Sequence, residues 1–236
     1  MEYFKTGLQV DVHDVDYNGV AKASSLMRYI QSAAQTQLTQ NGLSYDELRK
    51  RHRAFILSKI KIEFTDTVRA YEPLVAMTYP ANSRGYSFLR CYKLKRDGVT
   101  VARAVSVWAL VDTEKHSLVR VNDFDLHLDT YEALDFPLTR IVIPKGIAPI
   151  GKYTVNYDDA DQNRHMNNTK YPDMYSNFLP LENKRISSIT ISYLNEAPLN
   201  EILTVERIEL DGVFYFRTIR EDGKVNTEAE ITLTDL

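Results

Sequence analysis

Apolar residues near the start of the chain follow the period of a helix. They form one stripe made of Leu26, Tyr29, Ile30, Ala33, Ala34 and Leu38. This spacing places all six on one face of a helix. Asn41 and Gly42 favour the end of that helix, because both residue types are common in turns. Ser44 and Glu47 have the spacing of a capping box, which predicts a second, short helix up to Arg51.

The pattern then changes to strict alternation. Ser58, Ile60, Ile62 and Phe64 alternate with Lys59, Lys61 and Glu63. A period of two predicts a β-strand with one polar face. Further strands are expected at residues 74–79, 86–94 and 99–112, and Asp97-Gly98 is typical of the hairpin turn between the last two.

Residues 113–150 show no sustained period and contain three prolines. Prolines and mixed charge without a period indicate a connecting segment. We expect a linker at residues 126–148, with a short helix around residues 129–134. This linker would separate an N-terminal unit at 1–125 from a C-terminal unit at 149–236.

The second half restates the order of the first. Its predicted elements are a strand at 152–157, a helix with apolar positions Tyr171, Met174, Tyr175 and Phe178, and strands at 185–193, 202–210, 213–220 and 224–233. Asp14–Asn18 matches Asp159–Asn163, and both stretches precede a helix. Such similarity implies two copies of one supersecondary unit. Val20 stands where the second copy has His165, so we expect the chemistry in the C-terminal copy.

The stretch from residue 159 to 175 concentrates polar side chains before that second helix. Asp161, Asn163 and His165 occupy alternate positions, the spacing of an extended segment whose side chains point the same way. Asn167 or Asn168 can then cap the helix. An imidazole beside an acid and an amide is a candidate for proton transfer. The plainer interpretation is a pre-helix turn with a hydrogen-bonded histidine.

Composition narrows the class of protein. The 44% apolar and 26% charged content is ordinary for a soluble globular protein. No run approaches the roughly 18 apolar residues of a membrane span, and the N-terminus lacks the pattern of a secretory signal. A net charge of −3 argues against nucleic-acid binding. Cys91 is the single cysteine, which excludes internal disulfides and favours a reducing, cytoplasmic location.

Two motifs of the second half resemble those of the acyl-acyl-carrier-protein thioesterases of plants and bacteria. The family signature Asp-x-Asn-x-His-x-Asn-Asn-x-x-Tyr corresponds here to Asp161, Asn163, His165, Asn167, Asn168 and Tyr171. Residues 191–196 resemble the family strand that ends in a catalytic glutamate, here Glu196. A weaker match covers Ser106–Trp108 and Ser117-Leu118. The resemblance spans nearly the whole chain and implies an α+β tandem double hot-dog fold, in which each repeat is a long helix wrapped by an antiparallel β-sheet.

This resemblance implies hydrolysis of fatty acyl-ACP thioesters to free fatty acid and ACP. The implied catalytic residues are Asp161, Asn163, His165 and Glu196. Our hypothesis is that His165 and Glu196 activate a water, while Asn163 orients the substrate or stabilises the oxyanion. Asp161 would fix His165 or Asn163, and a covalent role for a carboxylate stays open.

One departure from the family bears on the nucleophile. Many plant members carry a cysteine directly after the glutamate, where this chain has Ala197. Cys91 falls in a predicted strand of the other repeat, where a free cysteine is usually packed and inert. We therefore expect water to attack the thioester.

The expected ligands follow from the same resemblance. The partner is an acyl carrier protein that bears a fatty acyl phosphopantetheine, and no cofactor is implied. The first-repeat stripe Leu26, Tyr29, Ile30 and Ala33 is a candidate wall of the acyl pocket, although the same spacing also describes a plain core. The remaining histidines lack the ligand spacing of a metal site. Pairing of the two units could be satisfied within the chain or extended to a homodimer.

Three alternative functions stay open on the sequence. An acyl-CoA thioesterase shares the fold and chemistry and differs in the carrier of the thioester. A hot-dog dehydratase or hydratase would also use a histidine and a carboxylate. A non-catalytic acyl-binding protein would need the cavity without the polar cluster. The fold cannot choose among them, because function is determined by the site.

Overall fold

The computed structural model describes residues 3–236. The elements of the first half are β1 (Phe4–Gln9), η1 (Val12–Asp14), α1 (Ala23–Gln40), α2 (Tyr45–Lys50), β2 (Arg53–Phe64), β3 (Pro73–Pro80), β4 (Phe88–Arg96), β5 (Val99–Asp112), β6 (Ser117–Val119) and η2 (Val121–Asp123). Those of the second half are β7 (Ala148–Thr154), η3 (Asn168–Lys170), α3 (Tyr171–Ser176), β8 (Lys184–Tyr193), β9 (Ile202–Leu210), β10 (Val213–Ile219) and β11 (Val225–Asp235).

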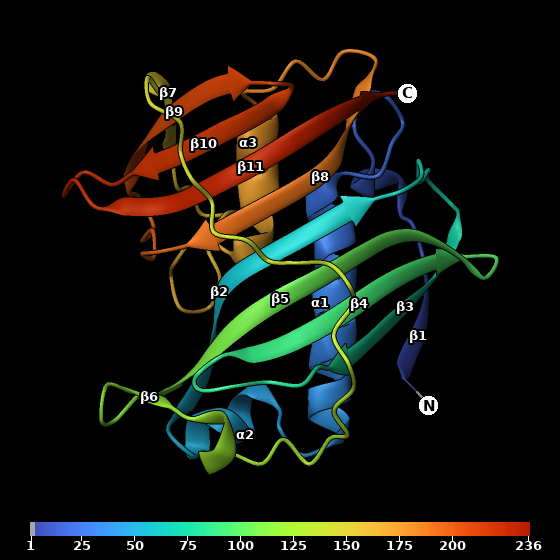
Figure 1. Ribbon diagram of the computed structural model, residues 1–236, viewed down its shortest axis with the longest axis vertical. Helices are drawn as coiled ribbons and strands as arrows, with labels where there is room; N and C mark the ends of the chain where they lie inside the picture. The colour runs from blue at the N-terminus through green and yellow to red at the C-terminus, as the bar shows by residue number, and fades with distance from the viewer. Residues whose placement is uncertain (1–2) are drawn as a thin grey trace.

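Within these residues, eleven strands form one antiparallel sheet. Ten of them follow the order β1-β3-β4-β5-β2-β8-β11-β10-β9-β7, and β6 pairs with β5. The two halves meet where β2 pairs with β8, from Lys59↔Ser192 to Glu63↔Ser188. Both α1 and α3 lie on the same side of the curved sheet, and the connecting chain crosses its other side (Figure 1). The expected double hot-dog architecture is confirmed, and the two units pair within one chain.

The main core lies between the sheet and the two helices. Ile60, Ile62 and Phe64 of β2 are buried, whereas the lysines and the glutamate between them are partly exposed. The predicted alternation is thus confirmed, except that Ser58 lies in a β-bulge between Leu57 and Lys59. No helix within residues 3–236 is long and apolar enough to cross a membrane.

The internal repeat is visible in the hydrogen bonds of two turns, one before α1 and the other before η3. The N–H of Asp16 donates to the carbonyl of Val20, and that of Asp161 donates to the carbonyl of His165, each at 2.8 Å. The two aspartate carboxylates also accept from the N–H groups of Val20 and His165. Val20 is therefore the structural counterpart of His165, as the sequence predicted.

The second helix is shorter than expected. Helix α3 has 6 residues, against 18 in α1. After Ser176 the backbone hydrogen bonds join residues three apart, as in a 3-10 helix. The Phe178 N–H donates to the Tyr175 carbonyl and the Leu179 N–H to the Ser176 carbonyl. Pro180 then ends the helical path, since proline has no N–H and disfavours helical geometry in the residue before it.

The short helix expected around residues 129–134 does not form. This segment is extended, and Tyr131 makes a parallel bridge with Ala81. Leu134 donates its N–H to the sulfur of Cys91 at 3.4 Å. The prediction was wrong because tertiary contacts with a second, smaller core outweigh local helix preference.

Candidate active site

The polar stretch Asp161 to His165 forms a tight turn, not the extended segment that its alternate spacing suggested. Asp161 Oδ1 accepts the N–H of Asn163 at 2.8 Å and that of His165 at 3.4 Å. Its Oδ2 accepts Asn163 Nδ2 at 3.3 Å. Arg164 has a φ of 64°, which closes the turn. An aspartate that bonds the backbone two residues on favours a turn over an extended strand, so Asp161 organises the loop.

The turn brings His165 to Glu196, 31 residues further along the chain. His165 Nδ1 lies 3.2 Å from Glu196 Oε2. The N–H of Met166 donates to the carbonyl of Ala197 at 2.8 Å, and His165 forms a bridge with Pro198. These backbone contacts hold the segment after β8 against the turn. The two side chains are 33% and 59% exposed, so both can reach a ligand.

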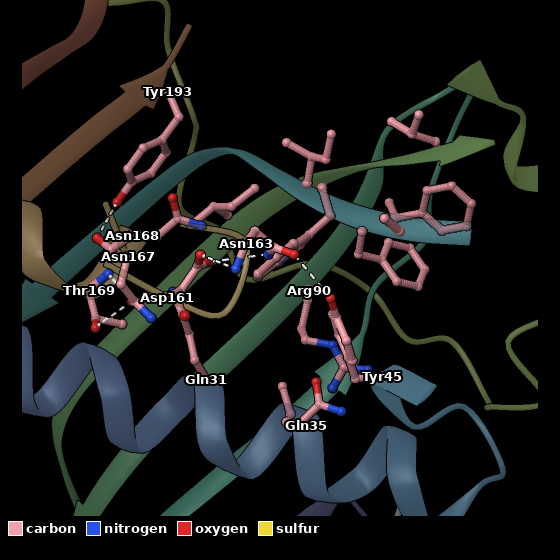
Figure 2. Close-up of a pocket in the computed structure, with 18 of the residues that line it drawn as sticks. Gln31, Gln35, Tyr45, Arg90, Asp161, Asn163, Asn167, Asn168, Thr169 and Tyr193 are labelled. Atoms are coloured by element: carbon pink, nitrogen blue, oxygen red, sulfur yellow. Dashed lines mark hydrogen bonds between the residues drawn. The ribbon is translucent and has the colours of Figure 1, made fainter. Parts of the chain in front are cut away.

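The other residues of the signature support the start of η3. Asn167 is the N-cap, because its side chain accepts from the N–H of Thr169 at 2.9 Å. The Asn168 carbonyl accepts from the Tyr193 hydroxyl at 2.9 Å, and the ring of Tyr193 packs edge-on against Tyr171. Burial raises the pKa of both tyrosines, so both stay neutral. Figure 2 shows Asn167, Asn168 and Thr169 beside Asp161.

A cavity of about 710 Å³ begins at this cluster. Asp161, Asn163, His165 and Glu196 line one part of it, and its remaining walls come largely from the first half, namely α1, α2, β2, β4 and β5. Hydrophobic walls include Leu57, Phe88 and Trp108. A concave site with a few convergent polar groups is the usual form of a small-molecule site.

The residues predicted as acyl-pocket walls lie elsewhere. They are Leu26, Tyr29, Ile30 and Ala33, and none of them lines the large cavity. Leu26, Ile30 and Ala33 are buried in the main core. The Tyr29 hydroxyl bonds Asp14, and burial together with that carboxylate raises the pKa of Tyr29 to about 12.

The part of α1 that lines the cavity is an adjacent, mostly polar stripe, which shares only Ala34 and Leu38 with the predicted apolar stripe. It comprises Arg28, Gln31, Ser32, Ala34, Gln35 and Leu38. The apolar stripe of the helix packs against the sheet, so the cavity borders the more polar flank. Periodicity identified the buried face correctly and could not show that the cavity lies beside it.

Three of the cavity residues have notable environments and were not identified from the sequence. The Tyr45 hydroxyl donates to Asn163 Oδ1 at 3.0 Å, which joins α2 to the polar turn. Gln31 Nε2 is enclosed and has no hydrogen-bond partner among the described residues. Arg90 is buried in β4. Of these, Arg90 had a signal in the sequence, since a charged residue inside the apolar run of a central strand is unusual.

Cys91 lies apart from the cluster. Its side chain is fully buried in the smaller core and does not line the large cavity. Burial raises the pKa of the thiol, which disfavours the thiolate that a nucleophile needs. The prediction that this cysteine is packed in a strand is confirmed.

Comparison with known families gives matches along nearly the entire chain. The model of the acyl-ACP thioesterase N-terminal domain matches residues 1–126, and that of the acyl-ACP thioesterase C-terminal domain matches residues 146–235. Acyl-[acyl-carrier-protein] hydrolase FATB2 of Cuphea viscosissima, a chloroplastic protein, is 22% identical over 226 residues, which cover 85% of this chain. The chain spans about half the length of the curated relatives it matches, 53% in this case.

Solved structures show the same fold. An acyl-ACP thioesterase from Bacteroides thetaiotaomicron has a TM-score of 0.89 and 20% identity, covering 98% of this chain and 97% of the other. The 12:0-ACP thioesterase from Umbellularia californica has a TM-score of 0.85 and 16% identity, covering 99% and 97% of the two chains.

Proposed function

Because this chain belongs to the acyl-ACP thioesterase family, we propose that it hydrolyses fatty acyl-ACP to a free fatty acid and ACP. The observation that carries the proposal is the 3.2 Å contact between His165 and Glu196 at the edge of the 710 Å³ cavity. A histidine paired with a carboxylate can activate water as a general base, and the cavity offers room for an acyl chain.

In the proposed mechanism, Glu196 accepts a hydrogen bond from Nδ1 of His165. This bond would leave Nε2 unprotonated and free to take a proton from water. The water oxygen bonds to the thioester carbonyl carbon, the carbon–sulfur bond then breaks, and the sulfur leaves with its electron pair. A thiol pKa of about 8.5 means that the leaving group needs little acid assistance.

Asn163 is proposed to face the thioester carbonyl. Its Oδ1 accepts from Tyr45, and one of its two Nδ2 protons is directed to Asp161. The second Nδ2 proton is left for the substrate oxygen, where a donor of this kind is worth roughly 10²–10³ in rate. Asp161 would act by holding the turn, since it binds the backbone of Asn163 and His165.

The two halves are proposed to have different roles. Residues 149–236 would supply the reacting side chains, and residues 1–125 most of the walls around the acyl chain, with 126–148 as the connection. This division accords with the cavity, whose polar end lies in the second half and whose other walls lie mainly in the first.

The direct test is release of free thiol from matched acyl-ACP and acyl-CoA substrates over several chain lengths. We expect turnover with acyl-ACP at a higher kcat/KM than with acyl-CoA. A higher kcat/KM with acyl-CoA would show that the substrate is acyl-CoA and not acyl-ACP. Release from neither would contradict hydrolysis and favour a dehydratase or an acyl-binding protein.

Cys91→Ser should leave kcat/KM within about twofold of the wild type, because the thiol lies outside the cavity. The expected cost is one of stability, roughly 1–3 kcal/mol for placing a hydroxyl in this core. Parallel thiol-release assays and thermal melts would check both. A folded Cys91→Ser protein without activity would contradict water as the nucleophile.

A further inference from the structure

Arg90 is an unusual residue for the middle of a buried strand. It is 7% exposed and lies in β4 between Phe88 and Tyr92, whose side chains share its face of the strand. Its Nη1 donates to Gln37 Oε1 at 2.7 Å and to Thr78 Oγ1 at 3.1 Å. Both acceptors are neutral, so these bonds do not balance the charge.

The guanidinium of Arg90, a residue that lines the cavity, has donors that no described residue uses. No carboxylate within the described residues forms an ion pair with Arg90. The Nε and Nη2 atoms of Arg90 donate no hydrogen bond to any described residue. Gln31 Nε2, Arg185 Nε and Arg220 Nε are fully enclosed without a hydrogen-bond partner within residues 3–236, whereas Nε and Nη2 of Arg90 are not. Arg90 lines the 710 Å³ cavity. Burial lowers the pKa of the guanidinium, but arginine remains protonated in proteins. A fixed positive charge with open donors therefore borders this space.

Arg90 and Glu196 belong to different parts of the sheet. Strands β5 and β2 separate β4 from β8, the strand that leads to Glu196. Three strand spacings of about 4.8 Å place the backbones of β4 and β8 roughly 14 Å apart across the sheet. Gln37, which Arg90 binds, lies in the last turn of α1. In Figure 2, Arg90 lies beside Tyr45, whose hydroxyl bonds Asn163, and away from Asn167, Asn168 and Thr169.

We propose that Arg90 determines substrate specificity by binding an oxygen at the distal end of the acyl chain. This inference rests on the proposed function, since it requires the thioester to be held at His165 and Glu196. A chain of staggered carbon–carbon bonds about 1.5 Å long advances roughly 1.3 Å per carbon, so a chain that spans the roughly 14 Å between these two strands has about ten carbons. The substrate class is a medium-length acyl chain with a terminal hydroxyl or carboxylate.

An unsubstituted chain end would fit this place poorly. Its methyl group would remove water from a buried cation without replacing the lost hydrogen bonds, which is costly. A hydroxyl or carboxylate oxygen accepts from the free guanidinium donors, and the carboxylate also balances the charge. Polarity at this end of the cavity thus favours an oxygen-bearing substrate.

The test compares three acyl-ACP substrates of about ten carbons: the unsubstituted chain, its ω-hydroxy form and its ω-carboxy form. For the wild type, we expect a kcat/KM roughly 10- to 100-fold higher for at least one oxygenated chain, the gain of a charge-assisted hydrogen bond. Arg90→Met should remove this preference and favour the unsubstituted chain. The matched control is Arg103→Met, which removes an arginine that pairs with Glu63 outside the cavity.

Each outcome has a defined meaning. A preference for both oxygenated chains would show that Arg90 recognises the chain end by hydrogen bonding. A preference for the carboxylate alone would show that it does so by charge pairing. Equal or faster turnover of the unsubstituted chain by the wild type overturns the inference and leaves the proposed hydrolysis intact. This wild-type comparison decides the matter even if Arg90→Met fails to fold.

Turnover of none of the three contradicts the proposed hydrolysis, and a binding measurement then decides the role of Arg90. The free ω-dicarboxylic acid should raise the Tm of the wild type more than the monocarboxylic acid of the same length does. The difference should vanish in Arg90→Met and persist in Arg103→Met. Equal Tm shifts in the wild type would overturn the inference.

Discussion

Glu196→Gln is expected to lower kcat/KM by roughly 10²–10⁴, the contribution of a positioned general base. The amide keeps the size of the side chain but loses the negative charge that orients His165 and stabilises its protonated form. The carboxylate is 59% exposed and lies 3.2 Å from Nδ1 of His165. An exposed side chain of this kind contributes little to folding, so the loss should appear in turnover and not in the melting temperature.

Thiol-release kinetics and thermal melts on the same preparations would check this expectation. Glu182→Gln is the matched control, because it makes the same chemical change at an exposed position outside the cavity. It should leave both measurements unchanged. Near-normal kcat/KM in a folded Glu196→Gln protein would remove Glu196 from the mechanism.

His165→Ala should lose activity by a similar factor, roughly 10²–10⁴, and the double variant with Glu196→Gln should be little worse than either single variant. Residues that act as a unit give strongly non-additive losses, since removing one also abolishes the catalytic contribution of the other. The contacts of the His165 backbone with Asp161 and Pro198 survive the substitution, so the turn should keep its shape.

A double-mutant cycle on kcat/KM measures this coupling. His127→Ala provides the control, because His127 also pairs with a carboxylate, that of Asp125 at 2.9 Å, and these two exposed side chains do not line the cavity. It should be silent. Losses that add in the double variant would show that the histidine and the glutamate act independently.

Regular elements could be predicted from the sequence because their patterns are local. Alternation in β2 and the helical stripe of α1 reflect one buried face each, and the capping box at Ser44 is confirmed by a bond from the Glu47 N–H to its hydroxyl. Segment 129–134 was predicted wrongly because its contacts are with residues distant in the chain, such as Ala81.

The candidate site was predictable only in part. Spacing identified the polar stretch but not its turn, because the carboxylate of Asp161 binds the backbone and closes the loop. The meeting of His165 with Glu196 could be expected from the family resemblance alone, since 31 residues and a strand separate them. Tyr45 and Arg90 reach the cavity through sheet and helix packing, which no local period reports.

The turn before α1 has the same backbone hydrogen bonds as its counterpart before η3, with Val20 in place of His165. The counterpart of Glu196 is Thr67, because Val68 and Ala197 accept equivalent N–H groups, those of Ala21 and Met166. The same loop shape therefore forms in both halves, although the imidazole and the carboxylate occupy these positions only in the second half. Main-chain geometry is thus an unreliable marker of active family members, and an imidazole–carboxylate pair is the feature to search for.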